Sequence, residues 1–344
     1  MARQRIGILY GTFDPVHSGH LRAALSALDR GEADQVFLVP YTPGAGACAS
    51  GAEDRWRMAV AACSGNRQLV PSRAGLDHSG KMKEKEILRL FREEYPKADS
   101  FLISEPDPVT GFPGCLTPSF LDVSTVEYIR AKGLYGQVRR IDQADRWLDS
   151  LFSALNPHRF AHTLSVAWTA RRLAEIHGCD DLKAEQAGLL HDCAKCLPLP
   201  VMQRIAREYS LTDDPEILCS GGLLHSLVGA RVALDQYGME DPEVLEAVAR
   251  HTTGAPGMSR LSMCVCLADS IELRREDYPG LEETRRVAEH SLEKALLMSL
   301  ESGSAYVLSR GKSLHPRTLE TIAWLKTLPA VRGYNELKEK MADE

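Results

Sequence analysis

Residues 187–199 read AGLLHDCAKCLPL, and the adjacent His191 and Asp192 lie within an apolar pattern of helical character. A histidine or an aspartate in such a stretch costs free energy unless it is paired, hydrogen-bonded or bound to a metal. Neighbouring residues of a helix point about 100° apart, so both side chains can reach one ion at the lip of a helical bundle. A single adjacent histidine and aspartate often occur together by chance. Here they indicate a metal site whose ligands lie on helices.

Four more candidate ligands lie in or beside similar helical stretches. They are His162 in NPHRFAHTLSVA, His225 in GGLLHSLVGA, His251 in VARHTTGAPGMS and Asp269 in VCLADSIELRR. Imidazoles mixed with carboxylates suit iron, manganese, cobalt or magnesium with open coordination positions, rather than a closed structural zinc site. We expect one ion at a set of four, His162, His191, Asp192 and Asp269. A second ion at His225 and His251, with Asp192 as a bridge, would complete a pair about 3.5–4 Å apart.

The chain around these residues shows no convincing strand after about residue 145. Helical patterns cover residues 145–155, 162–177, 182–194, 201–208, 224–237, 241–250, 261–274, 281–301 and 316–328. Breakers such as Asn156-Pro157 and Gly178 separate them. The second part, residues 145–344, is therefore predicted to be an all-α bundle.

The first part, residues 1–140, alternates between strand and helix patterns. Strands are expected at 5–10, 35–40, 68–72 and 100–104, and helices at 21–29, 52–62, 82–94 and 123–132. This alternation predicts a parallel sheet with right-handed crossovers, an α/β Rossmann-like domain. Residues 105–119 are rich in proline and glycine and predict a loop, and Ser124 or Thr125 is the expected N-cap of the helix that follows.

The first strand runs into GTFDPVHSGH, residues 11–20. Gly11 lets the backbone approach a phosphate closely, and the helix that begins near Ser18 presents an N-terminus that favours an anion. His17 and His20 can both point at that phosphate and stabilise its developing charge, which makes them the catalytic candidates of this half. Thr12 and Phe13 complete the expected nucleotide-binding loop. The alternative is a capped turn whose histidines face solvent.

Bulk properties exclude some classes of partner. A net charge of −6 argues against duplex nucleic acid as the main partner, although nucleotides need only a local basic cluster. No signal peptide and no apolar run of about 20 residues is visible, so we expect a cytoplasmic protein without a membrane partner. The nine cysteines, including Cys193 and Cys196 in a C-x-x-C, are expected to be reduced thiols.

The second half resembles the HD superfamily, and within it the YqeK-type symmetrical bis(5′-nucleosyl)-tetraphosphatases. The similarity rests on AHTLSVAWTARRLA, AGLLHDCAKCLP, LLHSLVGARVA, VARHTTGAPGMSRLSMCVCLADSIELRR and TRRVA, and the HTTG run is especially specific. The resemblance implies hydrolysis of diadenosine tetraphosphate to two ADP at a dinuclear metal centre. The implied ligands are His162, His191, Asp192, His225, His251 and Asp269.

Other polar residues near these ligands are candidates for phosphate binding. Lys195 lies about one helical turn from His191, so it is expected to contact a bridging phosphate of the substrate. It is also expected to offset the charge of the departing ADP. Lys195 and Asp192 are the expected catalytic residues of this half. Thr252 offers a hydroxyl. Arg274, about 140° round a helix from Asp269, would reach the site only through its length, and Arg285 is a further cation. For these residues a solvated or capping role is an equal alternative.

The first half resembles the nicotinate-nucleotide adenylyltransferases, which transfer AMP from ATP to a pyridine mononucleotide with magnesium. GTFDPVHSGH and DRWRMAV (54–60) carry the similarity. Four other family motifs are altered. A PPHK-like run is replaced by YTPGAGACASG, an SYT-x-DTL helix start by HSGKMKEKEIL, and a GAD segment by SEPDPVTGFPG, while DVSTVEYIR leaves Arg130 out of register. The part that holds the adenylate phosphates is intact, and the part that holds the pyridine is eroded.

The prediction is thus a fusion of a nucleotidyltransferase-like domain with an HD hydrolase that acts on small nucleotides: diadenosine tetraphosphate, ADP and ATP. The first half is a remnant that binds ATP, an active adenylyltransferase or a structural partner. Adenylyl transfer with an accessory HD half and a nucleotide sensor without turnover are the rival functions. Two divalent or trivalent ions (iron, manganese or cobalt) are expected in the HD half, and magnesium with ATP in the other. Metal identity, base preference and a homodimeric state stay open.

Overall fold

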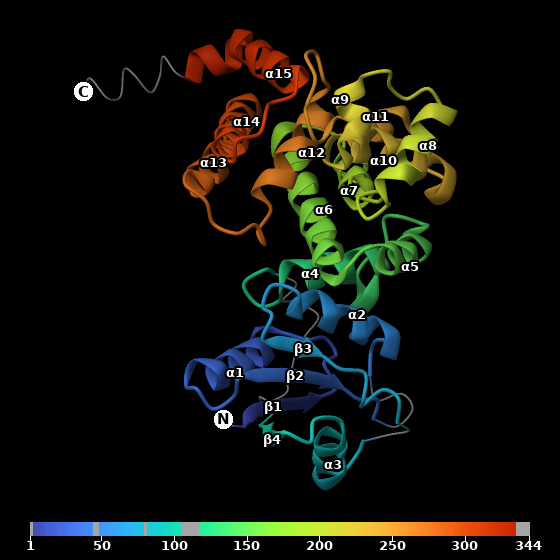
Figure 1. Cartoon of the computed structure of the whole chain (residues 1–344), viewed down its shortest axis with the longest axis vertical. Helices are drawn as coiled ribbons and strands as arrows, with labels where there is room; N and C mark the ends of the chain where they lie inside the picture. The colour runs from blue at the N-terminus through green and yellow to red at the C-terminus, as the bar shows by residue number, and fades with distance from the viewer. Residues whose placement is uncertain (1–2, 44–47, 79–80, 105–116, 335–344) are drawn as a thin grey trace, which may run out of the picture. The chain divides into compact units, whose positions relative to one another are not determined.

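The computed structural model describes residues 3–43, 48–78, 81–104 and 117–334. The chain divides into two compact units, one ending at Ala144 and the other beginning at Asp145 (Figure 1). The first unit combines strands and helices, and the second consists of helices throughout its described residues. This arrangement confirms the predicted class, a Rossmann-like domain followed by an all-α HD-type bundle.

A four-stranded parallel sheet forms the centre of the first unit. Its strands are β1 (Gln4–Gly11), β2 (Gln35–Pro40), β3 (Leu69–Pro71) and β4 (Ala98–Ile103) in the order β3-β2-β1-β4. Ile6 of β1 pairs in register with Gln35 on one side and Ser100 on the other. The order reverses beside β1, and the carboxyl end of β1 is therefore where sheets of this type bind ligands. Residues 11–20 follow directly from that end.

Within the described residues of this unit, four helices accompany the sheet. They are α1 (Ser18–Asp29), α2 (Ala52–Cys63), α3 (Glu84–Glu94) and α4 (Val123–Lys132). Ile87 and Phe91 of α3 join Ile8 and Phe37 of the sheet in one buried apolar cluster. Burial of this apolar face, rather than helix propensity, holds α3 in place.

The start of α4 differs from the prediction. Asp122, not Ser124 or Thr125, is the N-cap, and its carboxylate accepts a hydrogen bond from the Ser124 backbone N–H at 3.0 Å. Ser124 and Thr125 lie inside the first turn and are fully buried. A carboxylate at the N-cap also interacts favourably with the helix dipole. Most of the predicted loop at 105–119 lies outside the described residues.

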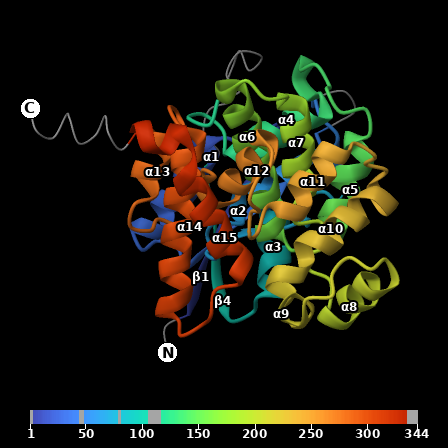
Figure 2. The same ribbon diagram turned by 90° about the horizontal axis from the view of Figure 1, so that it is seen from above.

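The second unit is a helical bundle followed by a C-terminal group of helices. Its helices are α5 (Ala144–Ala154), α6 (Pro157–His177), α7 (Asp181–Leu190), α8 (Leu199–Glu208), α9 (Pro215–Cys219), α10 (Gly221–Tyr237), α11 (Pro242–Arg250), α12 (Arg260–Ile271), α13 (Leu281–Ala288), α14 (Leu292–Ser309) and α15 (Pro316–Thr327). Helices α6, α7, α10, α11 and α12 pack side by side, as Figure 2 shows from above. None of the helices in the described residues is long and apolar enough to cross a bilayer.

Three predicted helices of this unit end earlier or divide. The helix expected over 182–194 stops at Leu190, because tight turns follow it, with the Cys193 N–H bonded to the Leu190 carbonyl. The helix expected over 261–274 stops at Ile271, since Glu272 has an extended ψ of 154°. The stretch 281–301 forms α13 and α14, separated where Ser291 caps the second helix through the Lys294 N–H.

The C-terminal helix α15 is anchored on the HTTG turn. Thr321 Oγ1 donates a hydrogen bond to the Thr253 carbonyl at 3.1 Å. Gly254 has a φ of +63°, and a Cβ placed there would lie 2.6 Å from Thr321 Cγ2. Both the left-handed backbone and the close approach of α15 therefore require glycine at this position.

Candidate functional site

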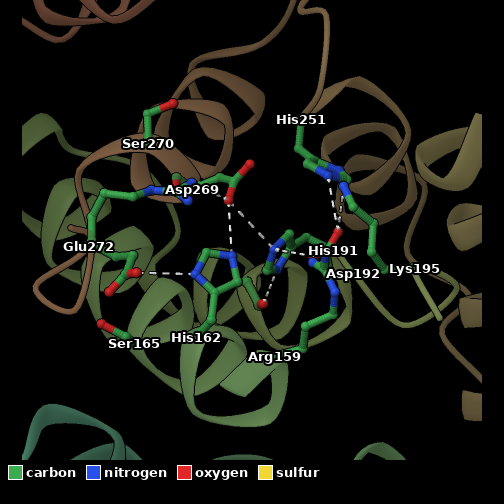
Figure 3. A network of polar contacts seen from close by, with 12 residues as sticks. Arg159, His162, Ser165, His191, Asp192, Lys195, His251, Asp269, Ser270 and Glu272 are labelled. Carbon is green, nitrogen blue, oxygen red and sulfur yellow. Dashed lines mark hydrogen bonds and ion pairs between the residues drawn. The ribbon is translucent and has the colours of Figure 1, made fainter. Parts of the chain in front are cut away.

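The six predicted ligands come together in the second unit, and Figure 3 labels all of them except His225. His162 lies in α6, His225 in α10 and Asp269 in α12, while His191 and His251 are the C-cap residues of α7 and α11 and Asp192 follows His191. His162 Nε2 lies 3.0 Å from Asp269 Oδ1, and His225 Nε2 lies 3.1 Å from Asp192 Oδ1. The packing of five helices brings together residues that lie up to about a hundred positions apart in the sequence.

His191 is shared by two groups of possible metal ligands. One group is His162, His191 and Asp269, and the other is His191, Asp192 and His251; within each, the ligand atoms lie within 4.8 Å of one another. The two oxygens of Asp192 face different partners. Oδ1 lies 3.6 Å from His251 Nε2, and Oδ2 lies 3.7 Å from His191 Nε2. Such a carboxylate can serve both groups.

Backbone carbonyls set the tautomers of three histidines. Nδ1 of His191 lies 2.7 Å from the Gly188 carbonyl, and Nδ1 of His251 lies 2.8 Å from that of Val248. Nδ1 of His225 lies 3.2 Å from the carbonyl of Gly221. A carbonyl only accepts, so each ring carries a proton on Nδ1, and Nε2 is the nitrogen that faces inward and offers its lone pair when the ring is neutral.

The inward-facing atoms fit a metal ion. His191 Nε2 and Asp192 Oδ1 are buried and make no hydrogen bond. Nε2 of His225 lies 3.0 Å from Nε2 of His251, so the two nitrogens are close enough to bind one ion. Neutral imidazoles and carboxylates that converge in this way are the donor set of a divalent transition metal.

Protonation states at the site match this donor set. Burial lowers the pKa of His191 and of His225 to about 4, so both rings are neutral near pH 7. Burial opposes ionisation of Asp192 and Asp269, but the surrounding histidines hold the pKa of both carboxyls well below the usual range. His162 differs: burial disfavours its charge, yet hydrogen bonds to Asp269 and Glu272 raise its pKa to about 9.

Two residues at the site escaped the sequence analysis. Arg159 Nη1 lies 2.9 Å from Asp192 Oδ2, and Glu272 Oε1 lies 3.1 Å from His162 Nδ1. Arg159 precedes His162 by three residues on α6, and Glu272 follows Asp269 by three at the end of α12. Residues three apart share a helix face, so this spacing was a usable signal.

Two of the predicted phosphate-binding residues lie at the cluster. Lys195 Nζ donates to His225 Nε2 at 2.9 Å and lies 3.5 Å from Asp192 Oδ1. Thr252 Oγ1 lies 3.3 Å from His225 Nε2 and 3.2 Å from His251 Nε2. Both side chains are therefore within reach of anything bound to these ligands.

Arg274 and Arg285 both form hydrogen bonds at the C-terminal end of α12. The helical-angle argument for Arg274 is wrong, because α12 ends at Ile271 and Arg274 lies in the following turn, where its backbone N–H donates to Glu272 Oε2 at 2.5 Å. Arg285 donates to the carbonyls of Ile271 and Glu272 at 2.9 and 2.6 Å. Arg285 thus caps the end of α12.

The C-x-x-C pair is split between two environments. Cys193 is buried and donates to the Gly229 carbonyl at 3.4 Å, and burial raises the pKa of its thiol. Cys196 is exposed. All the described cysteines are free thiols, as expected.

The predicted phosphate-binding loop of the first unit positions two buried histidines. His17 is the N-cap of α1, and its Nδ1 accepts a hydrogen bond from the Gly19 N–H at 3.1 Å. His20 Nδ1 accepts from the His17 N–H at 3.1 Å, and the two rings stack with centroids 3.7 Å apart. Because each Nδ1 accepts, each ring carries a proton on Nε2 and can donate to a phosphate oxygen. The alternative of solvent-facing histidines is wrong, since the two residues are only 6% and 5% exposed.

The same loop is braced by Arg55 of the DRWRMAV segment. Arg55 is buried, and its Nη1 donates to the carbonyls of Thr12 and Tyr41 at 2.7 and 2.6 Å. Phe13 has a positive φ of 46°, and its ring contacts the edge of His20 at 4.8 Å between centroids. Arg55 therefore joins the loops that follow β1 and β2, and Gly11 is the last residue of β1, directly before the first of these loops.

Comparison with known families finds two family models that match this chain, and their matches overlap over residues 159–180. The model of the HD domain matches residues 159–274, and that of the cytidylyltransferase-like proteins matches residues 8–180. The HD match and the cluster of histidines and aspartates together indicate a site for divalent metal.

Individual relatives differ in how much of this chain they match, from about a third to nearly the whole. The symmetrical bis(5′-nucleosyl)-tetraphosphatase of Bacillus subtilis is 38% identical over 176 residues, which are 50% of this chain and 91% of the relative. A probable nicotinate-nucleotide adenylyltransferase/Ap4A hydrolase of Mycoplasma genitalium is 26% identical and covers 87% of this chain and 97% of its own. A crystal structure of a predicted HD superfamily hydrolase involved in NAD metabolism from Clostridium acetobutylicum matches with 37% identity and a TM-score of 0.50, over 53% of this chain and 96% of that one.

Proposed function

Because this chain belongs to the cytidylyltransferase-like family through its first half and to the symmetrical bis(5′-nucleosyl)-tetraphosphatases through its HD half, we propose that it hydrolyses diadenosine tetraphosphate to two ADP. Both resemblances noted in the sequence are thereby confirmed. The observation that carries the proposal is the convergence of four histidine Nε2 atoms on the carboxylates of Asp192 and Asp269. We assign hydrolysis to residues 145–344 and nucleotide binding without hydrolysis to residues 1–140.

The proposed metal centre uses all six predicted ligands. His162, His191 and Asp269 would hold one ion, and Asp192, His225 and His251 the other; iron, manganese and cobalt suit such mixed donors. Bound there, the ions would polarise phosphoryl oxygens and activate water for attack on phosphorus. Asp192, with one oxygen toward each group, is the expected bridge.

Two cationic side chains are the proposed phosphate contacts. Arg159 and Lys195 approach opposite oxygens of Asp192, at 2.9 and 3.5 Å, and their side chains are 34% and 23% exposed. Each can therefore contact both the buried carboxylate and a ligand in solvent. The protein carries a net charge of −6, so a polyphosphate needs such local positive charge to bind. Lys195 would offset the charge on the departing ADP, and Thr252 would donate a hydrogen bond to a phosphate oxygen.

Product analysis tests the proposal. Protein loaded with iron, manganese or cobalt is incubated with diadenosine tetraphosphate, and the nucleotides are separated by ion exchange. We expect ADP alone, because the proposed cleavage divides the tetraphosphate symmetrically, and no product from the double variant His191→Ala/Asp192→Ala. Equal amounts of ATP and AMP would contradict symmetrical cleavage. Lack of turnover with every metal would favour a nucleotide sensor.

A second function is favoured by the two stacked histidines of the first unit. We propose that Nε2–H groups of His17 and His20 bind a phosphate of ATP, with magnesium, at the N-terminus of α1. The fused Mycoplasma relative, whose name joins an adenylyltransferase to an Ap4A hydrolase, supports this reading. Transfer of AMP to nicotinate mononucleotide is the corresponding activity.

Calorimetry and pyrophosphate release distinguish the three readings of this unit. ATP titrated into the full chain should bind, and His20→Ala should weaken binding by roughly 10- to 100-fold, since a hydrogen bond to a charged group contributes about 1.5–3 kcal/mol. Release of pyrophosphate from ATP and nicotinate mononucleotide would establish transferase activity. Binding without release would mean a remnant that holds ATP. No difference in ATP binding between the wild type and His20→Ala would argue for a structural partner.

A further inference from the structure

His162 differs from the other histidines of the cluster in the group that its Nδ1 contacts, the ring nitrogen that faces away from the cluster. His191, His225 and His251 each place Nδ1 against a backbone carbonyl of their own helix. His162 Nδ1 instead lies 3.1 Å from the carboxylate of Glu272, a residue 110 positions later (Figure 3). The orientation of this ring therefore depends on a side chain from another helix.

Glu272 is a buried carboxylate in a fixed position. The residue is 2% exposed and forms the C-cap of α12, three residues after Asp269. Its Oε2 accepts the Arg274 backbone N–H at 2.5 Å, which leaves Oε1 directed at His162. Burying an ionised carboxylate is costly, so a role beyond helix termination is the simpler account of it.

Arg285 fixes the backbone that carries Glu272. Its guanidinium donates to the carbonyls of Ile271 and Glu272 at 2.9 and 2.6 Å and also pairs with Glu282 at 2.5 Å. Helix α13 is thereby tied to the end of α12, and through Glu272 to the ring of His162 on α6. The contacts form one continuous path from α13 to the metal centre.

We propose that Glu272 is the positioning residue of the metal centre: its carboxylate holds one proton of His162 on Nδ1, so that Nε2 is the nitrogen that gives up its proton and faces the ion shared with Asp269 when metal binds. A carboxylate bound to the outer nitrogen fixes the tautomer and increases the electron-donating strength of the ring. Nε2 lies 3.0 Å from Asp269 Oδ1, so the ring presents that nitrogen beside the second ligand. The inference rests on the proposed metal centre but not on the identity of the nucleotide.

Manganese binding to the full chain tests the role without any substrate. Chelator-treated protein is titrated with Mn²⁺, and free ion is followed by its paramagnetic resonance signal. Glu272→Ala should weaken one class of Mn²⁺ sites roughly 10- to 100-fold, the usual effect of removing such a partner. Glu272→Gln should recover part of the loss, because the amide oxygen still accepts the Nδ1 proton but carries no charge. Glu276→Gln, which removes an exposed carboxylate four residues later, is the matched control and should bind as wild type.

A double-mutant cycle separates positioning from general structural support. In a His162→Gln background, Glu272→Ala should cause no further loss of Mn²⁺ affinity, because the ring through which it acts is gone. An equal loss in both backgrounds would overturn the proposal, as would binding by Glu272→Ala within twofold of wild type. Lowered thermal stability of Glu272→Ala and Glu272→Gln with unchanged Mn²⁺ affinity would also overturn it.

The outcome stays separable from that of the hydrolysis experiment. Loss of Mn²⁺ affinity in Glu272→Ala, together with no hydrolysis by the wild type, would keep the positioning role and reject the substrate. Wild-type protein that binds no Mn²⁺ would reject both the metal centre and the role of Glu272.

Discussion

Asp192→Asn should abolish hydrolysis of diadenosine tetraphosphate, with a fall in rate of roughly 10³-fold or more, as expected when charge stabilisation at the reacting phosphate is removed. Asp192 Oδ1 lies 3.1 Å from His225 Nε2, and Oδ2 lies 2.9 Å from Arg159. An amide replaces one acceptor oxygen by an NH₂ group, which would face either an unprotonated nitrogen or a guanidinium. It also removes the negative charge that two cations would share.

Initial rates measured by ion exchange, at saturating metal, check this expectation. Asp213→Asn is the matched control, because Asp213 is exposed on the same unit, and it should keep the wild-type rate. Circular dichroism of both variants verifies the helical fold. An Asp192→Asn variant that retains more than a tenth of the wild-type rate would contradict the bridging role.

Gly188→Ala should lower the free energy of unfolding of the helical unit by about 3 kcal/mol, the upper part of the usual range for overpacking a core. A Cβ at Gly188 would lie 2.5 Å from Ala167 Cα and 2.9 Å from Ala167 N. Both are backbone atoms that cannot rotate away, so α6 and α7 would have to separate. The Gly188 carbonyl also orients His191, and the same shift should reduce metal binding.

Gly229→Ala supplies the contrast. A Cβ there would meet the His191 carbonyl oxygen and Val248 Cγ1 at 3.5 Å, which is ordinary van der Waals contact. Alanine also favours the interior of a helix, so stability should be unchanged or slightly higher. Urea unfolding followed by tryptophan fluorescence reports mainly this unit, because Trp147, Trp168 and Trp324 belong to it and only Trp56 to the other. Equal unfolding midpoints for the two variants would show that α6 and α7 can separate at little cost.

Local patterns in the sequence sufficed for the class of fold and for the types of ligand. The β2 prediction at 35–40 and the α4 prediction at 123–132 match the observed bounds, because an apolar run or a helical period is a property of neighbouring residues. The ligands were recognisable for a similar reason. A histidine or aspartate in an apolar helix demands a partner whatever the partner is, so His191 and Asp192 stood out before any contact was known.

Contacts between distant helices decided the rest. Helix α12 ends at Ile271, where Glu272 turns its carboxylate toward His162 of α6 and Arg285 of α13 takes up the last carbonyls. The pattern of apolar residues within 261–274 does not indicate that the helix ends at Ile271. The prediction therefore placed Arg274 on the helix, which was wrong.

Residue patterns were enough to predict an α/β nucleotidyltransferase-like unit, an all-α HD unit and six candidate ligands. The packing of the helices shows what the patterns could not: Nε2 of His191 faces Asp192, Arg159 and Glu272 join the cluster, and Gly188 has no room for a side chain. An apolar pattern and its period are properties of neighbouring residues in one segment, so they can be read from the sequence. The direction of a lone pair and the closeness of two backbones are instead set by how separate segments pack.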